Sequence, residues 1–288
     1  MSCRTSIREE FRLINLRLCH HQPHRFVNAQ YHQVHRVFYV IYRWVIACFL
    51  LAVSIVSGNQ NGTGHYFIYL THWTFISLTF SHVVRAGSAL YYHVAHNETD
   101  TVVGEINEDR MPWYLKFLWV SFNVSGSPSL AVTIMYWGMV YTEDSTVDFV
   151  NFAVHGSNSI VVVLDQFVTG MPVRILHAHH PLIYAVLYSL FTGIYYAAGG
   201  TTAGGEKAIY AVLDYEKSPG LAVGLLLVAS FIAIPLLHVL LFGLYQLRVF
   251  LYRKCCLGNA VKDSSPETGQ NDNTMAVANP AFVPGDMC

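Results

Sequence analysis

The chain has 288 residues, of which 53% are hydrophobic and only 12% are Asp, Glu, Lys or Arg. Soluble domains carry roughly 25% of these charged residues, so the composition argues against a soluble globular fold. The formal net charge of −1 provides no field that would attract nucleic acid, and we expect no nucleic-acid partner.

Long apolar segments recur along the chain. A helix of about 20 largely apolar residues crosses the hydrocarbon core of a bilayer. Six segments fit: residues 37–56, 66–91, 113–140, 147–169, 181–198 and 221–250. The second and the fourth carry the most polar side chains. The sequence therefore predicts an all-α fold, a polytopic membrane bundle of about six transmembrane helices.

Polar segments flank this membrane domain, which we expect to cover residues 36–254. Residues 1–35 are rich in Arg and His and lack the apolar region of a cleavable signal peptide, so the first span must act as its own insertion signal. Residues 255–288 show no hydrophobic period and are predicted to be disordered. Both flanks are expected to be cytosolic tails.

The positions of the basic residues predict the orientation. With six spans, 15 of the 17 Lys and Arg residues, including Arg43 and Arg85, fall on one side, and only Lys207 and Lys217 fall on the other. Cytoplasmic flanks retain such residues during insertion, so both termini are predicted to be cytosolic. We expect the protein in the plasma membrane.

The cysteines are predicted to lie in the cytosol or in the bilayer, where disulfides are not expected. Cys255 and Cys256 directly follow Arg253 and Lys254 at the end of the sixth span. This juxtamembrane setting suits reversible palmitoylation. Two unmodified thiols are the alternative.

A polar stripe marks the fourth span. Asn151, His155, Asn158 and Asp165 are spaced by four, three and seven residues, which places them on one helix face. Polar groups are costly inside a bilayer, so such a stripe points to a functional site. Asp165 is expected in the inner half, at a depth similar to that of His238 in the sixth span, as part of a secondary polar network.

The second span carries a matching stripe that begins at Thr71. From the helical rise of about 1.5 Å per residue, Thr71 lies roughly 8 Å below the start of its span and His155 roughly 12 Å below the start of its own. These depths are compatible with contact in the outer half of the bundle. The alternative is that the hydroxyls and amides, Thr74 and Asn158 among them, only join helices.

Several motifs resemble those of the rolling stone family of invertebrate membrane proteins. They are Asn151-Phe-Ala-Val-His155, the acid Asp165, and Arg174-Ile-Leu-His-Ala-His-His180-Pro181. The resemblance covers about residues 26–254. The family is in turn distantly similar to the androgen-induced-gene family of membrane hydrolases, which cleave fatty acid esters of hydroxy fatty acids. Their threonine motif resembles Tyr69-Leu70-Thr71, and their histidine motif resembles Asn151, His155 and Asp165, with Glu in place of the aspartate.

The distant resemblance implies that Thr71 is a nucleophile, with His155 as its base. Threonine is a poor nucleophile at neutral pH and needs such a base. Asn151 or Asn158 would orient the imidazole or donate to an oxyanion. The implied substrate is a fatty acid ester that enters from the membrane lipids, and no cofactor is expected.

Two alternatives remain open. The closer resemblance implies a factor in myoblast-type fusion or cell contact that performs no chemistry, for which residues 199–220 form the outward loop with room for a protein partner. A metal enzyme is suggested by His177, His179 and His180. That single short cluster supplies too few ligands, so we expect no metal site.

Overall fold

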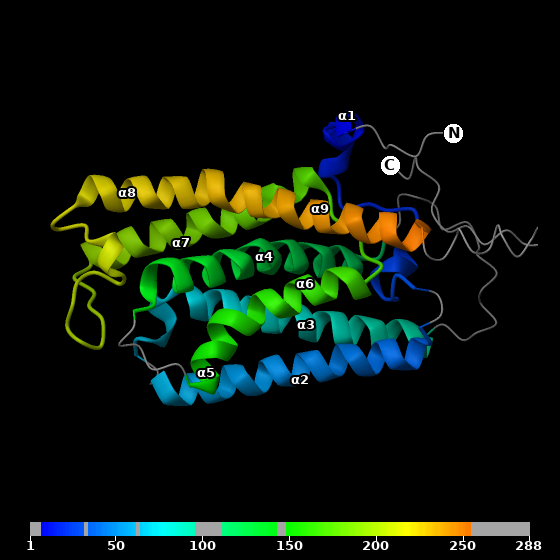
Figure 1. Ribbon diagram of the computed structural model, residues 1–288, viewed down its shortest axis with the longest axis horizontal. Coiled ribbons are helices and arrows are strands. Elements are labelled where there is room, and N and C mark those ends of the chain that lie inside the picture. The colour runs from blue at the N-terminus through cyan, green and yellow to red at the C-terminus, as the bar shows by residue number, and fades with distance from the viewer. Residues whose placement is uncertain (1–6, 32–33, 62–63, 96–110, 143–147, 255–288) are drawn as a thin grey trace, which may run out of the picture.

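The computed structural model describes residues 7–31, 34–61, 64–95, 111–142 and 148–254. Within these residues the chain makes six long helical passes that run side by side (Figure 1). The passes are α2 (Arg36–Asn61), α3 (Leu70–Ala95), α4 (Trp113–Met135) with a π turn (Tyr136–Val140), α5 (Phe149–Phe152) joined to α6 (Asn158–Val168) by a π turn (Ala153–Ser157), α7 (His179–Ala197), and α8 (Pro219–Val228) joined to α9 (Ile234–Tyr252) by a π turn (Ala229–Ala233).

This architecture confirms the predicted all-α bundle. The described residues contain no β-strand, only an isolated bridge between Ala29 and Thr169. In the part of the chain that the structure describes, three stretches are long and apolar enough to cross a membrane: Arg36–Gln60, Trp113–Val140 and Pro219–Tyr252. The chain is therefore a helical membrane protein.

Helix α4 lies in the middle of the bundle and contacts α3, α6, α7 and α9 (Figure 1). Its centre is a run of small residues, Ser125-Gly126-Ser127-Pro128-Ser129. Small side chains let membrane helices approach closely. A Cβ atom on Gly126 would lie 3.0 Å from a methyl group of Leu241, so glycine permits the close contact between α4 and α9.

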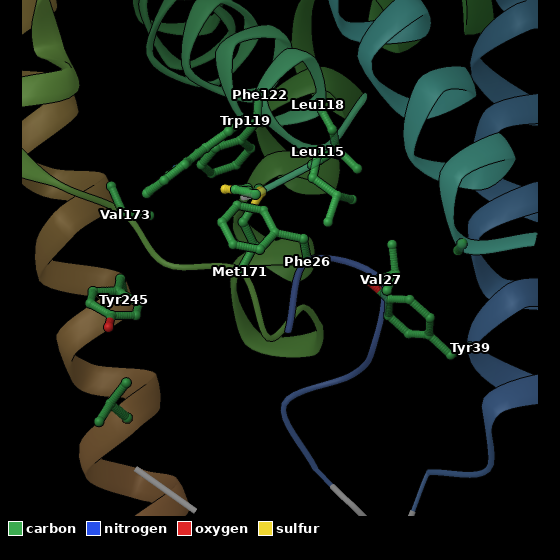
Figure 2. Close-up of a cluster of buried hydrophobic side chains, with 13 residues drawn as sticks. Phe26, Val27, Tyr39, Leu115, Leu118, Trp119, Phe122, Met171, Val173 and Tyr245 are labelled. Atoms are coloured by element: carbon green, nitrogen blue, oxygen red, sulfur yellow. The ribbon is translucent and has the colours of Figure 1, made fainter. Parts of the chain in front are cut away.

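The end of the bundle that carries the N-terminal segment is here called the terminal end. Residues 7–31 pack against it through two 3₁₀ turns, Leu13–Leu16 and Pro23–Phe26. Figure 2 shows Phe26 beneath Trp119, and their ring centroids are 4.9 Å apart. The Gly170 amide donates to the Asn28 carbonyl, so the N-terminal segment is joined to the chain that follows α6.

Cys19 is disulfide-bonded, and its partner lies outside the described residues. The expectation of no disulfides is therefore wrong for this residue. Cys255 and Cys256 and the rest of the C-terminal tail also lie outside the described residues.

A buried double ion pair connects three of the helices. Asp165 of α6 accepts from Arg43 of α2 with one carboxylate oxygen and from Arg85 of α3 with the other. The three side chains are 1%, 1% and 4% exposed in that order. Tyr42 also donates to Asp165, at 3.2 Å. Arg43 and Arg85, which the sequence grouped with the cytosolic flanks, are thus structural partners inside the bundle, because a buried carboxylate requires compensating cations.

The double ion pair predicts a large effect of Asp165→Asn on stability. The substitution leaves two buried guanidinium groups without a carboxylate, and breaking a buried pair in this way costs about 3–5 kcal/mol. We expect the free energy of unfolding in mixed micelles to fall by that amount. Asp148→Asn is the matched control, because Asp148 caps α5 by accepting from the Asn151 amide and asparagine caps equally well. An equal loss in both variants would contradict the structural role of Asp165.

Candidate functional site

Thr71 and His155 come together at the end of the bundle opposite to the terminal end. Thr71 lies in the first turn of α3, and His155 lies in the π turn between α5 and α6. Thr71 Oγ1 is 3.5 Å from His155 Nδ1, at the long limit of a hydrogen bond. Thr71 is buried and His155 is partly exposed. The geometry allows the threonine hydroxyl to donate to the imidazole.

The His155 ring is fixed by an aromatic stack. It lies parallel to the ring of Tyr136, with centroids 3.4 Å apart and an interplanar angle of 8°. Tyr136 begins the π turn that follows α4, so two π turns meet at this stack. Such wide turns are frequent at functional sites. Tyr136 belongs to a helix that carries neither of the two motifs, so no sequence pattern indicated it.

The side-chain amides of Asn151 and Asn158, both predicted to act on His155, have different hydrogen-bond partners. Asn151 Nδ2 donates to Tyr136 Oη at 2.6 Å, so Asn151 acts on His155 only through the tyrosine. Asn158 Oδ1 instead accepts from Thr133 Oγ1 at 2.8 Å, where it joins α6 to α4. The expected single stripe assumed a continuous α-helix. The π turn adds a residue to one turn, which rotates the following positions by about 100°.

A second histidine lies beside Thr71. His72 Nδ1 is 2.6 Å from the carbonyl oxygen of Tyr66, and the two rings stack with centroids 3.8 Å apart. Because a carbonyl oxygen only accepts, His72 Nδ1 carries the proton and Nε2 keeps its lone pair. In the sequence, its position directly after Thr71 could have indicated that His72 lies near the candidate site.

The loop after α7 holds the start of α3. Tyr210 Oη accepts from the Leu70 amide at 2.9 Å, and Tyr188 Oη of α7 donates to the Ile68 carbonyl at the same distance. Burial raises the pKa of Tyr210, so its hydroxyl stays neutral. Part of the proposed partner loop at 199–220 is therefore packed inward. Lys207 and Glu216, which pair at 3.0 Å, remain exposed.

Asp165 and His238 belong to different networks. Asp165 pairs with arginines of α2 and α3, whereas His238 hydrogen-bonds to Ser127 at 3.3 Å and to the Arg174 carbonyl at 3.0 Å. The expected shared network is therefore not formed, because α4 and the loop after α6 supply closer partners to His238. Among the described residues, no group of three His, Cys, Asp or Glu side chains is placed to hold a metal ion.

Comparisons with known proteins agree with the resemblance in the motifs. The family model described as "Protein rolling stone" matches residues 2–261. "Protein rolling stone" of Drosophila melanogaster is 29% identical over 249 residues, which cover 84% of this chain and 90% of that protein. No solved structure matches. The matched region contains all six helical passes and both members of the Thr71 and His155 pair, and the chain belongs to the rolling stone family of membrane proteins.

Proposed function

We propose that the chain hydrolyses fatty acid esters inside the membrane, with Thr71 as nucleophile and His155 as general base. The observation that carries this proposal is the 3.5 Å separation of Thr71 Oγ1 and His155 Nδ1. Catalytic hydrogen bonds are often long in ligand-free sites and shorten when substrate binds. The motif resemblance to the androgen-induced-gene hydrolases selects the same two residues.

The reaction needs no cofactor. Thr71 Oγ1 attacks the ester carbonyl carbon while His155 Nδ1 takes the hydroxyl proton. The oxyanion collapses, the ester C–O bond breaks, and His155 returns the proton to the leaving alcohol. Water then attacks the acyl threonine, His155 takes a proton from it, and the fatty acid leaves as the threonine hydroxyl is restored. The stack on Tyr136 keeps the imidazole in place through both steps.

The surroundings suit a lipid substrate. Phe149 and Phe152 lie on the same helical pass as His155 and are 69% and 45% exposed, and Phe67 near the start of α3 is 57% exposed. Apolar side chains exposed on a membrane bundle face acyl chains rather than water. An ester would thus reach His155 sideways from the bilayer.

Substitutions at the two site residues test the chemistry. We expect Thr71→Ala and His155→Ala each to lower ester turnover in membranes by at least about 100-fold, since general-base catalysis contributes 10²–10⁴-fold. Labelling by a fluorophosphonate probe should be lost in Thr71→Ala. Thr74→Ala is the matched control, because it removes another buried threonine hydroxyl of α3, one that lies 3.4 Å from Tyr184 Oη. Turnover that survives both site substitutions would reject this mechanism.

The alternative is a factor in cell contact or myoblast-type fusion, which the family resemblance suggests and which the exposed part of the 199–220 loop would serve. A cell fusion assay separates the two roles. Fusion that persists in Thr71→Ala but is lost when Lys207 and Glu216 are both replaced by alanine would favour the contact role. Loss of fusion in Thr71→Ala together with loss of turnover would make lipid hydrolysis the basis of fusion.

We also propose that both termini face the cytosol, in the plasma membrane. Of the fifteen basic residues assigned to the terminal side, Arg43, Arg85, Arg174 and Arg248 are buried. The remaining eleven still outnumber Lys207 and Lys217 on the opposite side. The disulfide at Cys19 is the opposing observation, because disulfides are rare in the cytosol.

Glycosylation decides between the two orientations. The natural sequon at Asn97 lies outside the described residues and would face the cytosol, so we expect no glycan there. The double substitution Gly205→Asn and Lys207→Thr creates a sequon in the opposite loop, where asparagine tolerates the positive φ of Gly205. We expect this site to be modified, as measured by a mobility shift that a glycosidase reverses. A glycan on Asn97 would reverse the orientation.

A further inference from the structure

The buried charges around Asp165 do not balance. Besides Arg43 and Arg85, the Arg248 side chain of α9 is 0% exposed and interacts electrostatically with Asp165. Arg248 donates only to backbone carbonyls, those of Gln166 and Met171, each at 2.8 Å. Among the described residues, Asp165 is the one carboxylate that pairs with these arginines. Three cations and one anion leave an excess of two positive charges inside the bundle.

The protein's own dipoles do not remove this excess. The carbonyls that bind Arg248 lie at and beyond the C-terminal end of α6, where the helix dipole is equivalent to about half a negative charge. At least one full positive charge therefore remains uncompensated. An unpaired charge within a membrane bundle is expensive and calls for a counter-ion.

Unused hydrogen-bonding groups surround the same charges. Arg85 Nε and Arg248 Nε have no hydrogen-bond partner, and neither do Gln166 Nε2, Gln166 Oε1 and His82 Nδ1. Gln166 is adjacent to Asp165 in sequence, and His82 lies in α3 three residues before Arg85, on the neighbouring turn of the same helix. Buried polar groups in proteins nearly always have a partner, and orphaned groups indicate a bound water or ion. Most of these orphans are N–H donors, which suit an anion.

Burial limits the size of the occupant. Arg85 is 4% exposed, His82 is 1% exposed, and Gln166 and Arg248 are fully buried. A lipid headgroup with its acyl chains would need an opening that these values do not allow. We infer that the arginine cluster of Arg43, Arg85 and Arg248 holds a small anion of the size of chloride in the half of the bundle nearest the terminal end. Water molecules alone would satisfy the donors but leave the charge uncompensated.

This site is independent of the proposed ester hydrolysis and is tested without an activity assay. The purified full-length chain is melted in neutral detergent while sodium chloride replaces sodium gluconate at constant ionic strength and pH. We expect a saturable rise in melting temperature with chloride, and the same with bromide. Arg248→Gln should weaken the dependence, because it deletes the arginine that lacks a carboxylate partner and halves the excess of positive charge from two to one.

Two further variants sharpen the test. Lys254→Gln removes a positive charge from an exposed side chain at the end of the same helical pass, and its chloride dependence should equal that of the wild type. Asp165→Asn raises the excess from two charges to three, so chloride should stabilise it more than the wild type. Equal melting in chloride and gluconate for the wild type would overturn the inference, and so would equal loss of the dependence in Arg248→Gln and Lys254→Gln.

A direct observation decides the matter if Arg248→Gln does not fold. Crystals of the wild type grown in sodium bromide should show an anomalous scattering peak within hydrogen-bonding distance of the Arg85 or Arg248 guanidinium. Absence of bromide there, with ordered water in its place, would show that the excess charge is tolerated without an anion and would end the proposal.

Discussion

The bundle depends on one carboxylate shared by two arginines. Charged groups buried apart from each other would each cost several kcal/mol, whereas Arg43, Asp165 and Arg85 compensate one another only when α2, α6 and α3 are at one relative depth. Apolar packing is tolerant of sliding along the helix axis, but an ion pair is not. The double ion pair therefore fixes the register of α6 against α2 and α3, from which it is distant in the chain.

The register set by the ion pair also determines the relative depth of Thr71 and His155 in the candidate site. Both α3 and the pass formed by α5 and α6 run toward the terminal end, so their residues can be counted back from the ion pair. Thr71 precedes Arg85 by 14 residues, about 21 Å, and His155 precedes Asp165 by 10 residues, about 15 Å. The difference of about 6 Å matches the reach of an arginine side chain, which leans toward the N-terminus of its helix while aspartate is short. Thr71 and His155 consequently lie at one level.

The sequence predicted the passes and the central pair of the site for a clear physical reason. Apolar runs and the spacing of polar residues are local features, and they placed all six passes within a few residues of their observed ends. Partners were harder to predict. The local sequence pattern does not indicate that Arg43 and Arg85 pair with Asp165. The apolar periodicity likewise does not predict that Phe26 packs on Trp119. Asn158 joins α6 to α4, which is one of the two interpretations that the sequence allowed. The choice between them depended on a π turn, which leaves no mark in a pattern that assumes 3.6 residues per turn.

The two halves of the bundle differ in how their polar side chains are packed. Around Asp165 the side chains of Arg43, Arg85 and Arg248 are buried, and the ion pair in that half fixes the depth of the helices. The imidazole ring of His155 is partly exposed. Its position is fixed by the stack on Tyr136 and by the π turn that contains His155. The proposed role of His155 needs both fixed orientation and access, and these requirements conflict in a uniformly packed core. Placing the ion pair at one end and the π turns at the other satisfies both within one set of helices.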